Sequence, residues 1–351
     1  MLKSTKRKLQ KKRDLTKQKN NRWYTDQLKS LLGNQWAMFY IILGGRMTGK
    51  SYSLADFFCN QKKKKKDKVQ NYWLRISETS TKLMLANKAQ GLIDADLVRK
   101  YNLELSTKGC HVYNRGEPFI DVMPLSQMAK TKGVAIFDKD FDGEINIVLD
   151  EFQLEQGERR TSFDILYNFI GTLENIIRTR KNKIRIFLVG NTLEEASTIL
   201  KAFNFLPEAF GRFKLKRKRC VIDNLAPTEE YLKDREGSAA DILGGKEMSN
   251  YSNSLSKDTS LISKQRLQHP EYLIKFSKQN NDIFVVCDNN VITRYKRQPV
   301  KHVIPMRPYL NERYAPEQCK AIIDRFDARA FSFDSLITLA YFEGALSKIR
   351  K

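Results

Sequence analysis

The stretch FYIILGGRMTGKS, residues 39–51, joins an apolar run to a glycine-rich loop, and the helix-like run YSLADFF follows at 52–58. Gly44, Gly49, Lys50 and Ser51 fit the spacing G-x-x-x-x-G-K-[ST]. In this pattern the glycines let successive backbone N–H groups surround phosphate groups, and the next helix points its positive N-terminal end at them. We therefore expect a strand, a phosphate-binding loop and a helix.

The side chains of this loop predict a nucleotide site. Lys50 is expected to reach the β and γ phosphates of ATP, and the Ser51 hydroxyl is expected to ligate Mg²⁺. The expected nucleotide-binding residues form one run: Gly44, Gly45, Arg46, Met47, Thr48, Gly49, Lys50, Ser51 and Tyr52. The alternative is a glycine-rich strand-to-helix turn with a solvated lysine, and a second motif is needed to decide between the two.

The second motif is INIVLDEF, residues 145–152, an apolar run that ends in Asp150 and Glu151. Such a run predicts a buried parallel strand, and open α/β sheets bind ligands at the carboxyl ends of their strands. Asp150 is expected to hold Mg²⁺, and Glu151 to polarise a water for in-line attack on the γ phosphate. An apolar run before Asp-Glu also arises by chance. Paired with the loop about a hundred residues earlier, it favours the nucleotide site.

A third strand is expected in KIRIFLVGN, residues 183–191, which ends in Asn191. Asn191 is a candidate for contact with the γ phosphate or the attacking water, and a plain strand-ending turn is the alternative. Just upstream, Arg178 and Arg180 lie two positions apart near an expected helix end, so they point to different faces. One of them could stabilise transition-state charge at a neighbouring subunit, although arginines in a basic chain are usually solvated.

The composition points to a polyanionic partner. The chain has 351 residues, with 63 Lys and Arg against 40 Asp and Glu and a net charge of +23, which favours nucleic acid over a membrane. The five cysteines are scattered without CxxC spacing, so they are expected to be reduced, intracellular thiols. No apolar run is long enough for a transmembrane segment, and the N-terminus is too polar for a signal peptide.

The chain is long enough for about two domains. Residues 1–22 are expected to form a basic arm that is disordered or folds on a partner, and residues 23–226 an α/β domain with strands at 39–44, 71–77, 145–150 and 184–190. The polar stretch 227–255 is expected to be a linker or lid, and 256–351 a smaller second domain with a β meander and a final helical pair.

Two segments of the first domain depart from its alternation of strands and helices, and each predicts a structure of its own. The run KKKKK at 62–66 is expected to be a solvated loop near a helix end. The segment CHVYNRGEPFIDVMP, residues 110–124, is expected to form a hairpin that turns at Asn114-Arg115-Gly116.

The order of motifs resembles one family. GGRMTGKSY, MPLSQMAKTKG, IVLDEF, IIRTRKNKIRIFLVGN and FLPEAFGRFKL look like the corresponding segments of the phi-29-like phage DNA-packaging ATPases, and the resemblance is best over residues 36–215. It implies an α/β fold: a P-loop NTPase domain of the additional-strand, catalytic-glutamate class, followed by a smaller C-terminal α+β domain resembling a vestigial RNase H-type nuclease.

The resemblance also implies roles for single residues. Arg46 would contact or sense the nucleotide, and Arg178 would act in trans as an arginine finger with Arg180 as its neighbour. Lys132, with Lys130 beside it in the loop after Pro124-Leu125-Ser126, would line a central DNA pore. The basic arm departs from the short N-terminus of the family, so its role stays open.

Nuclease activity in the second domain is one alternative. A two-metal nuclease needs several carboxylates that converge on paired ions. Six carboxylates are available in turn-like or helical positions where solvated charge is the ordinary explanation: Asp282, Asp288, Asp324, Asp327, Asp334 and Glu343. A module that binds RNA, the portal or DNA is therefore the preferred interpretation.

Together these expectations describe an ATP-driven translocase that packages double-stranded DNA into a viral prohead, as a homo-oligomeric ring expected to be a pentamer. ATP and Mg²⁺ are the expected cofactors, a structural RNA is a further candidate partner, and the expected location is the host cytoplasm with a transient stay on the prohead. The alternatives are a helicase-like nucleic-acid ATPase and a slow, nucleotide-gated DNA-binding assembly protein.

Overall fold

The computed structural model describes residues 25–127, 141–153, 163–177, 183–191, 198–243, 259–265, 267, 269–276, 283–288, 290–294, 300–306 and 316–350. The chain divides into two compact units, each treated by itself below: unit 1 comprises Met1–Ile199 and Ala209–Leu255, and unit 2 comprises Leu200–Glu208 and Ser256–Lys351. The short segment Leu200–Glu208, expected within the first domain, therefore groups with the second unit.

The strands of unit 1 form one mixed sheet in the order β3-β4-β5-β2-β6-β7-β1-β9-β8. The run from β5 to β9 is parallel throughout, and β3-β4, β4-β5 and β8-β9 are antiparallel pairs. The bounds are β1 Phe39–Leu43, β2 Val69–Arg75, β3 Leu105–Lys108, β4 His111–Asn114, β5 Glu117–Pro124, β6 Glu144–Asp150, β7 Ile184–Gly190, β8 Gly211–Leu215 and β9 Cys220–Asn224. The parallel sheet and the hairpin turning at Asn114–Gly116 are confirmed.

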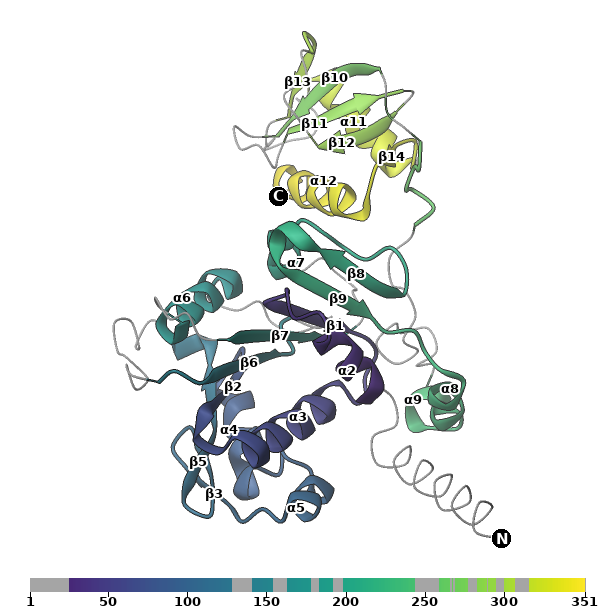
Figure 1. The fold of residues 1–351 in the computed structure, drawn as a ribbon. Coiled ribbons are helices and arrows are strands. Elements are labelled where there is room, and N and C mark those ends of the chain that lie inside the picture. Colours follow the sequence, from purple (N-terminus) through teal and green to yellow (C-terminus); the bar gives the residue numbers. More distant parts are fainter. Residues whose placement is uncertain are drawn as a thin grey trace. The chain divides into compact units, whose positions relative to one another are not determined.

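Helices cover both faces of this sheet, as Figure 1 shows: α2, α3 and α4 lie on one face and α6 on the other. The helical elements are α2 Thr25–Leu32, α3 Lys50–Lys65, η1 Lys66–Lys68, α4 Glu78–Ala89, α5 Ala95–Tyr101, α6 Ile165–Ile177, α7 Thr198–Phe203, η3 Lys216–Lys218, α8 Glu229–Arg235 and α9 Ala239–Ile242. None of the helices in the described ranges has the length and apolar character needed to cross a membrane.

The lysine run at 62–66 is not a loop, which corrects the expectation from sequence. Lys62 to Lys65 form the last turn of α3, and Lys66 begins η1. Four cations suit this place because a helix C-terminus carries partial negative charge. Lys65 also pairs with Glu144 at 2.7 Å. The run therefore belongs to the folded edge of the sheet.

Alternate residues of the central strands point to the two helical layers. Tyr40, Trp73, Val148 and Phe187 are buried in one cluster with α2, α3 and α4. The residues between them, such as Ile41 and Leu149, are equally buried on the other face, where α6 contributes its own buried apolar residues. Continuous apolar strands are what a parallel sheet covered on both sides requires.

A row of polar side chains crosses the buried part of three neighbouring strands. Asn146 on β6 donates to the Asn71 side chain on β2 at 3.0 Å, and Arg185 on β7 donates to Asn146 at 2.9 Å and to Glu144 at 2.8 Å. Arg185 and Lys65 together hold the pKa of Glu144 at about 2, against the opposing effect of its partial burial. This polar row is hydrogen-bonded inside the apolar sheet and fixes the strands in register.

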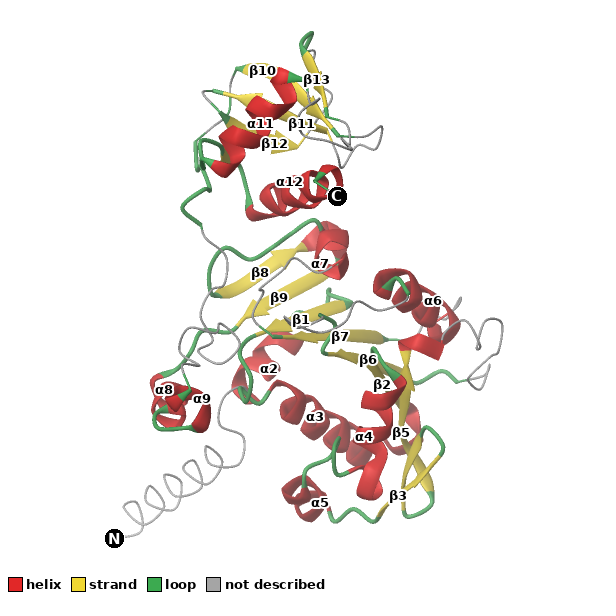
Figure 2. Ribbon diagram, turned by 180° about the vertical axis from the view of Figure 1, so that it is seen from behind, coloured by secondary structure: helices red, strands yellow, loops and turns green. Residues whose placement is uncertain are grey.

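The main sheet of unit 2 has the strand order β13-β10-β11-β12-β14 (Figure 2). β10 Pro270–Lys275, β11 Ile283–Cys287 and β12 Val291–Arg294 form the expected antiparallel meander, while β13 Val303–Pro305 and β14 Ser332–Phe333 pair in parallel at the two edges. α11 Glu317–Asp327 and α12 Leu336–Ile349 are the expected final helices. Phe342 of α12 packs against five aromatic rings: Phe276, Phe284, Phe326, Phe331 and Phe333.

We predict that Phe58→Ala destabilises unit 1 by about 3–5 kcal/mol, because it removes a fully buried ring and leaves a cavity. Phe58 is 0% exposed and meets Trp73 edge-on, with ring centroids 5.8 Å apart. Urea unfolding followed by Trp fluorescence measures the loss. Leu83→Ala is the control: this side chain is 68% exposed, so its truncation should change stability by less than about 0.5 kcal/mol. Equal losses of stability for the two substitutions would contradict the buried packing of Phe58.

Candidate active site

The glycine-rich loop lies between the end of β1 and the start of α3. Gly49 has φ 83° and Met47 has φ 61°, so the backbone turns through two left-handed positions before the helix begins. Glycine adopts this conformation without strain. Because Gly49 occupies the N-cap, no side-chain hydrogen bond caps the first turn of α3. The backbone N–H groups at the N-terminal end of α3 can therefore bind the oxygens of an anion.

Lys50 turns back into this loop. Its Nζ donates to the carbonyl oxygens of Gly44 and Gly45, both at 2.7 Å, and to Thr48 Oγ1 at 3.1 Å. The residue is only 8% exposed. Burial lowers the pKa of Lys50 to about 8, assisted by Arg46 and opposed by the carboxylates of Asp150 and Glu151. An ammonium in this position is poised to exchange carbonyl partners for phosphate oxygens.

Asp150 joins the two sequence motifs. It lies at the carboxyl end of β6, is 3% exposed, and its Oδ1 accepts a hydrogen bond from Ser51 Oγ at 3.1 Å. A hydroxyl and a carboxylate side by side form the pair of oxygen donors that Mg²⁺ prefers. The structure thus brings Ser51 and Asp150, 99 positions apart in sequence, into direct contact.

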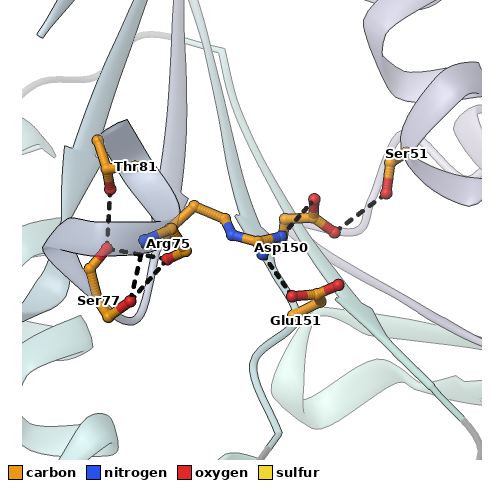
Figure 3. A network of polar contacts seen from close by, with 7 residues as sticks. Ser51, Arg75, Ser77, Thr81, Asp150 and Glu151 are labelled. Carbon is orange, nitrogen blue, oxygen red and sulfur yellow. Dashed lines mark hydrogen bonds and ion pairs between the residues drawn. The ribbon is translucent and has the colours of Figure 1, made fainter. Parts of the chain in front are cut away.

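Arg75 is a member of this site that the sequence analysis missed. It ends β2, next to β6, and its guanidinium bonds Asp150 Oδ2 at 3.1 Å with one nitrogen and Glu151 with the other (Figure 3). α4 begins just beyond it at the Ser77 N-cap, which accepts from Ser80 N–H. The signal available in sequence was an arginine directly after the apolar run YWL, but its importance depends on strand order.

Glu151 has an unusual backbone for a residue with a side chain, with φ 55°. Such a conformation is sparsely populated outside glycine and asparagine and occurs often at functional sites. Gly190, at the end of the adjacent strand β7, supports the turn: a Cβ there would lie 2.8 Å from Gln153 Oε1 and 2.9 Å from the Phe152 ring. Asn191 follows Gly190, so it emerges at the same edge of the sheet as Asp150 and Glu151.

Helix α8 also contacts the glycine-rich loop, and the sequence analysis did not predict this contact. The buried Tyr231 donates from its hydroxyl to the Arg46 carbonyl at 3.0 Å. Arg235 lies over the Tyr231 ring at 5.9 Å and contacts Met47 Sδ at 3.3 Å. The segment expected to be a linker or lid therefore begins with a helix that holds the backbone of the loop.

The remaining expected site residues fall into two groups. The Tyr52 hydroxyl donates to Asp96 on α5 at 2.5 Å, so only its backbone and ring remain available to a nucleotide. Arg178, Arg180, Lys130 and Lys132 lie outside the described residues. The described residues contain no group of three or more His, Cys, Asp or Glu side chains that could hold a metal ion.

Comparisons with known proteins identify the fold. No protein-family model matches the sequence, and no curated protein matches it. The chain is similar to the solved structure of the Phi-28 gp11 DNA packaging motor, with TM-score 0.58 and 12% identity over 95% of this chain and 98% of that one. It is also similar to the bacteriophage Phi-29 viral genome packaging motor assembly, with TM-score 0.64 and 16% identity over 92% and 98%. At these identities the comparison shows a shared fold along nearly the whole chain.

The buried ammonium of Lys50 leads us to predict that ATP binding depends on pH. A bound triphosphate favours the charged form of Lys50. Without a bound nucleotide, the pKa of Lys50 in the folded protein is about 8. ATP binding should therefore take up a proton above about pH 8, and the apparent affinity should fall by up to about tenfold for each further pH unit. Calorimetric titration in buffers of different ionisation enthalpy measures the uptake. Lys50→Arg stays charged over this range and should show none. An affinity that does not change between about pH 7.5 and pH 9.5 would contradict the prediction.

Proposed function

We propose that this chain is a P-loop ATPase, and the observation that carries the proposal is the meeting of Ser51 with Asp150 beside Lys50. A loop of the spacing G-x-x-x-x-G-K-[ST], a buried Asp at the end of a parallel strand and a following Glu form the constellation that binds and hydrolyses nucleoside triphosphates. The strand order β6-β7-β1 supports the additional-strand, catalytic-glutamate class, because one strand lies between those that carry the two motifs.

Each residue has a part in the proposed reaction. Lys50 exchanges its loop carbonyls for the β and γ phosphates, and backbone N–H groups of residues 44–52 surround them. Ser51 and Asp150 would hold Mg²⁺, which when bound would neutralise charge on the phosphates. Glu151 orients and polarises the attacking water, and Asn191 lies at the same strand end to contact that water or the γ phosphate.

Arg75 must release Glu151 before Glu151 can act on water. The guanidinium now pairs with both carboxylates, one of which is the exposed Glu151 side chain. A magnesium ion held by Ser51 and Asp150 would add positive charge beside Arg75, which would weaken the two ion pairs of its guanidinium.

We further propose that ATP hydrolysis drives double-stranded DNA into a viral prohead. Two observations support this function: the fold is shared with DNA-packaging motors of two phages, and the chain carries a net charge of +23. The proposed assembly is a homo-oligomeric ring, a pentamer, that acts in the host cytoplasm while docked on the prohead portal, with a structural RNA as a candidate partner. Lys130 and Lys132 are the proposed pore contacts, and Arg178 with Arg180 the proposed trans arginines.

We propose a binding role for unit 2, on a fold related to RNase H-type nucleases. Two of the six carboxylates considered for nuclease chemistry have structural partners: Asp334 accepts from Thr338 at 2.5 Å and also bonds Thr293, and Asp327 accepts from Arg350 at 2.7 Å. Asp334 thus belongs to the cap of α12, whose Ser335 N-cap side chain accepts from Thr338 N–H. These partners support a module that binds the portal, RNA or DNA.

Two substitutions test the ATPase. Lys50→Ala should abolish productive ATP binding and lower turnover by at least about 10²-fold, because it removes a preorganised cation from the phosphates. Glu151→Gln should leave ATP and Mg²⁺ binding intact but lower turnover by about 10²- to 10⁴-fold, because the carboxylate that handles water is gone. Fluorescent-nucleotide binding and phosphate release measure the two effects separately. Lys108→Ala, an exposed lysine of β3, is the control, and wild-type turnover by Lys50→Ala would refute the site.

The ring is tested by mixing subunits. If Arg178 acts in trans, Arg178→Ala leaves its own pocket intact but disables a neighbour's, at a cost of about 10³ to 10⁵ in rate. Mixtures of Arg178→Ala and Glu151→Gln should recover part of the ATPase activity, because some interfaces then combine an intact pocket with an intact arginine. Co-assembly is verified by differently tagged subunits. If proven mixed rings show no recovery at any ratio, Arg178 does not act across the interface.

A further inference from the structure

A row of basic residues lies at the edge of the unit 1 sheet opposite the nucleotide site. Because β2, β6, β7, β1 and β9 are parallel neighbours, their amino ends share one edge, and the glycine-rich loop, Asp150 and Asn191 emerge at the other. The segments that enter β2, β7 and β9 carry seven basic residues, here called the basic ridge: Lys66, Lys68, Lys183, Lys216, Arg217, Lys218 and Arg219. All seven are exposed.

Backbone contacts hold the ridge segments against the sheet. The Arg219 carbonyl accepts from Met38 N–H at 2.8 Å and from Phe39 N–H at 3.0 Å, which ties the β8–β9 turn to the start of β1. The Lys183 carbonyl accepts from Ile145 N–H at 2.9 Å. Gly143 lies so close to the Lys68 carbonyl that a side chain at position 143 would clash with it. The register Val69–Glu144 and Ile145–Ile184 aligns these segments at a common edge.

The charge of the ridge is mostly not compensated within the sheet edge. Among the described residues, no ion pair is formed by Lys66, Lys68, Lys216 or Arg217. Glu144 is the partly buried acid of this edge, and it is already shared by Lys65, Arg185 and Lys183. The exposed acids Asp67 and Asp142 offset only part of the charge. The basic ridge does not extend to β5, the neighbour of β2. The turn before β5 carries Arg115, and this residue forms an ion pair with Glu104.

The shape and composition of the ridge select the partner. Five adjacent strands, spaced roughly 4.8 Å apart, give a row roughly 19 Å long. At 3.4 Å per base pair this matches about five to six base pairs of a duplex. None of the large exposed apolar side chains in the described ranges lies in the ridge segments. Protein hot spots and membrane-binding surfaces need such apolar anchors, whereas a phosphate backbone does not.

We propose that the basic ridge is a binding surface for the phosphate backbone of a nucleic-acid duplex, separate from the nucleotide site. β6 spans seven residues between the two edges, roughly 23 Å of extended chain, so the ridge residues do not reach the ATP site. Duplex DNA and duplex RNA offer the same phosphates to this row. Binding is expected to be independent of base sequence, because contacts to phosphates carry no sequence information.

The test compares two variants of the full chain that lose the same charge. The ridge variant carries Lys66→Gln, Lys68→Gln, Lys216→Gln and Arg217→Gln. The control variant carries Lys82→Gln, Lys88→Gln, Arg99→Gln and Lys108→Gln, four exposed basic residues of α4, α5 and β3. Binding to 30-base-pair DNA and RNA duplexes is measured by fluorescence anisotropy from about 50 to 200 mM KCl, without nucleotide.

The ridge variant should reduce the slope of log affinity against log salt by about 3 to 4, since each lost phosphate contact removes about 0.9. The control variant should reduce it by less than about 1. Basal ATP turnover, measured without nucleic acid, should match the parent chain in both variants, which separates this proposal from the ATPase proposal.

A reduced slope on both duplexes, or on only one of them, supports the proposal and in the second case identifies the duplex. If the ridge and control variants have equal slopes on both duplexes, the ridge is not a binding surface. Lys66→Gln with Arg217→Gln provides a milder variant with an expected slope change of about 2, for use if four substitutions lower the melting temperature. A preference of the parent chain for one base sequence that is lost in the ridge variant would also overturn the proposal.

Discussion

The contact between Ser51 and Asp150 is the constraint on which the rest of unit 1 depends. It joins the first turn of α3 to the end of β6, and β1 and β6 run in the same direction with β7 between them. Successive parallel strands require crossover connections, and helices on the two faces of the sheet contribute to them. The parallel sheet, the two helical layers and the site geometry are therefore consequences of one arrangement.

The site contains a buried charge and a strained backbone, and each lowers the free energy of unfolding. Lys50 is almost fully buried, and its ammonium is stabilised by two carbonyls and one hydroxyl rather than by water. Glu151 has a left-handed backbone that costs of order 1–3 kcal/mol in a residue with a side chain. The surrounding core must supply this energy. Such local costs are expected where a ligand, rather than the chain itself, is the intended partner of the polar groups.

Parts of this structure could be predicted from sequence because their signals are local. The runs 39–44, 145–150 and 184–190 are nearly continuous apolar segments, as expected for buried parallel strands, and the structure has strands at Phe39–Leu43, Glu144–Asp150 and Ile184–Gly190. The loop spacing and the paired carboxylates then indicated Lys50, Ser51, Asp150 and Glu151 as candidate site residues. β3 and β8 carry no comparable signal, because short edge strands are half polar and their pairing is decided by neighbours distant in sequence. The same reason explains why Arg75 and Tyr231 were missed: each reaches the site only through tertiary packing.

The polar row of Asn71, Asn146 and Arg185 has a consequence for how this sheet can change. A substitution at one position leaves a buried partner without its hydrogen bond, at a cost of about 1–3 kcal/mol, whereas three apolar residues together could pack well. Joint replacement would also remove the feature that distinguishes the native register from a slipped one. The three positions should therefore behave in evolution and in engineering as a single unit, which is retained whole or exchanged whole.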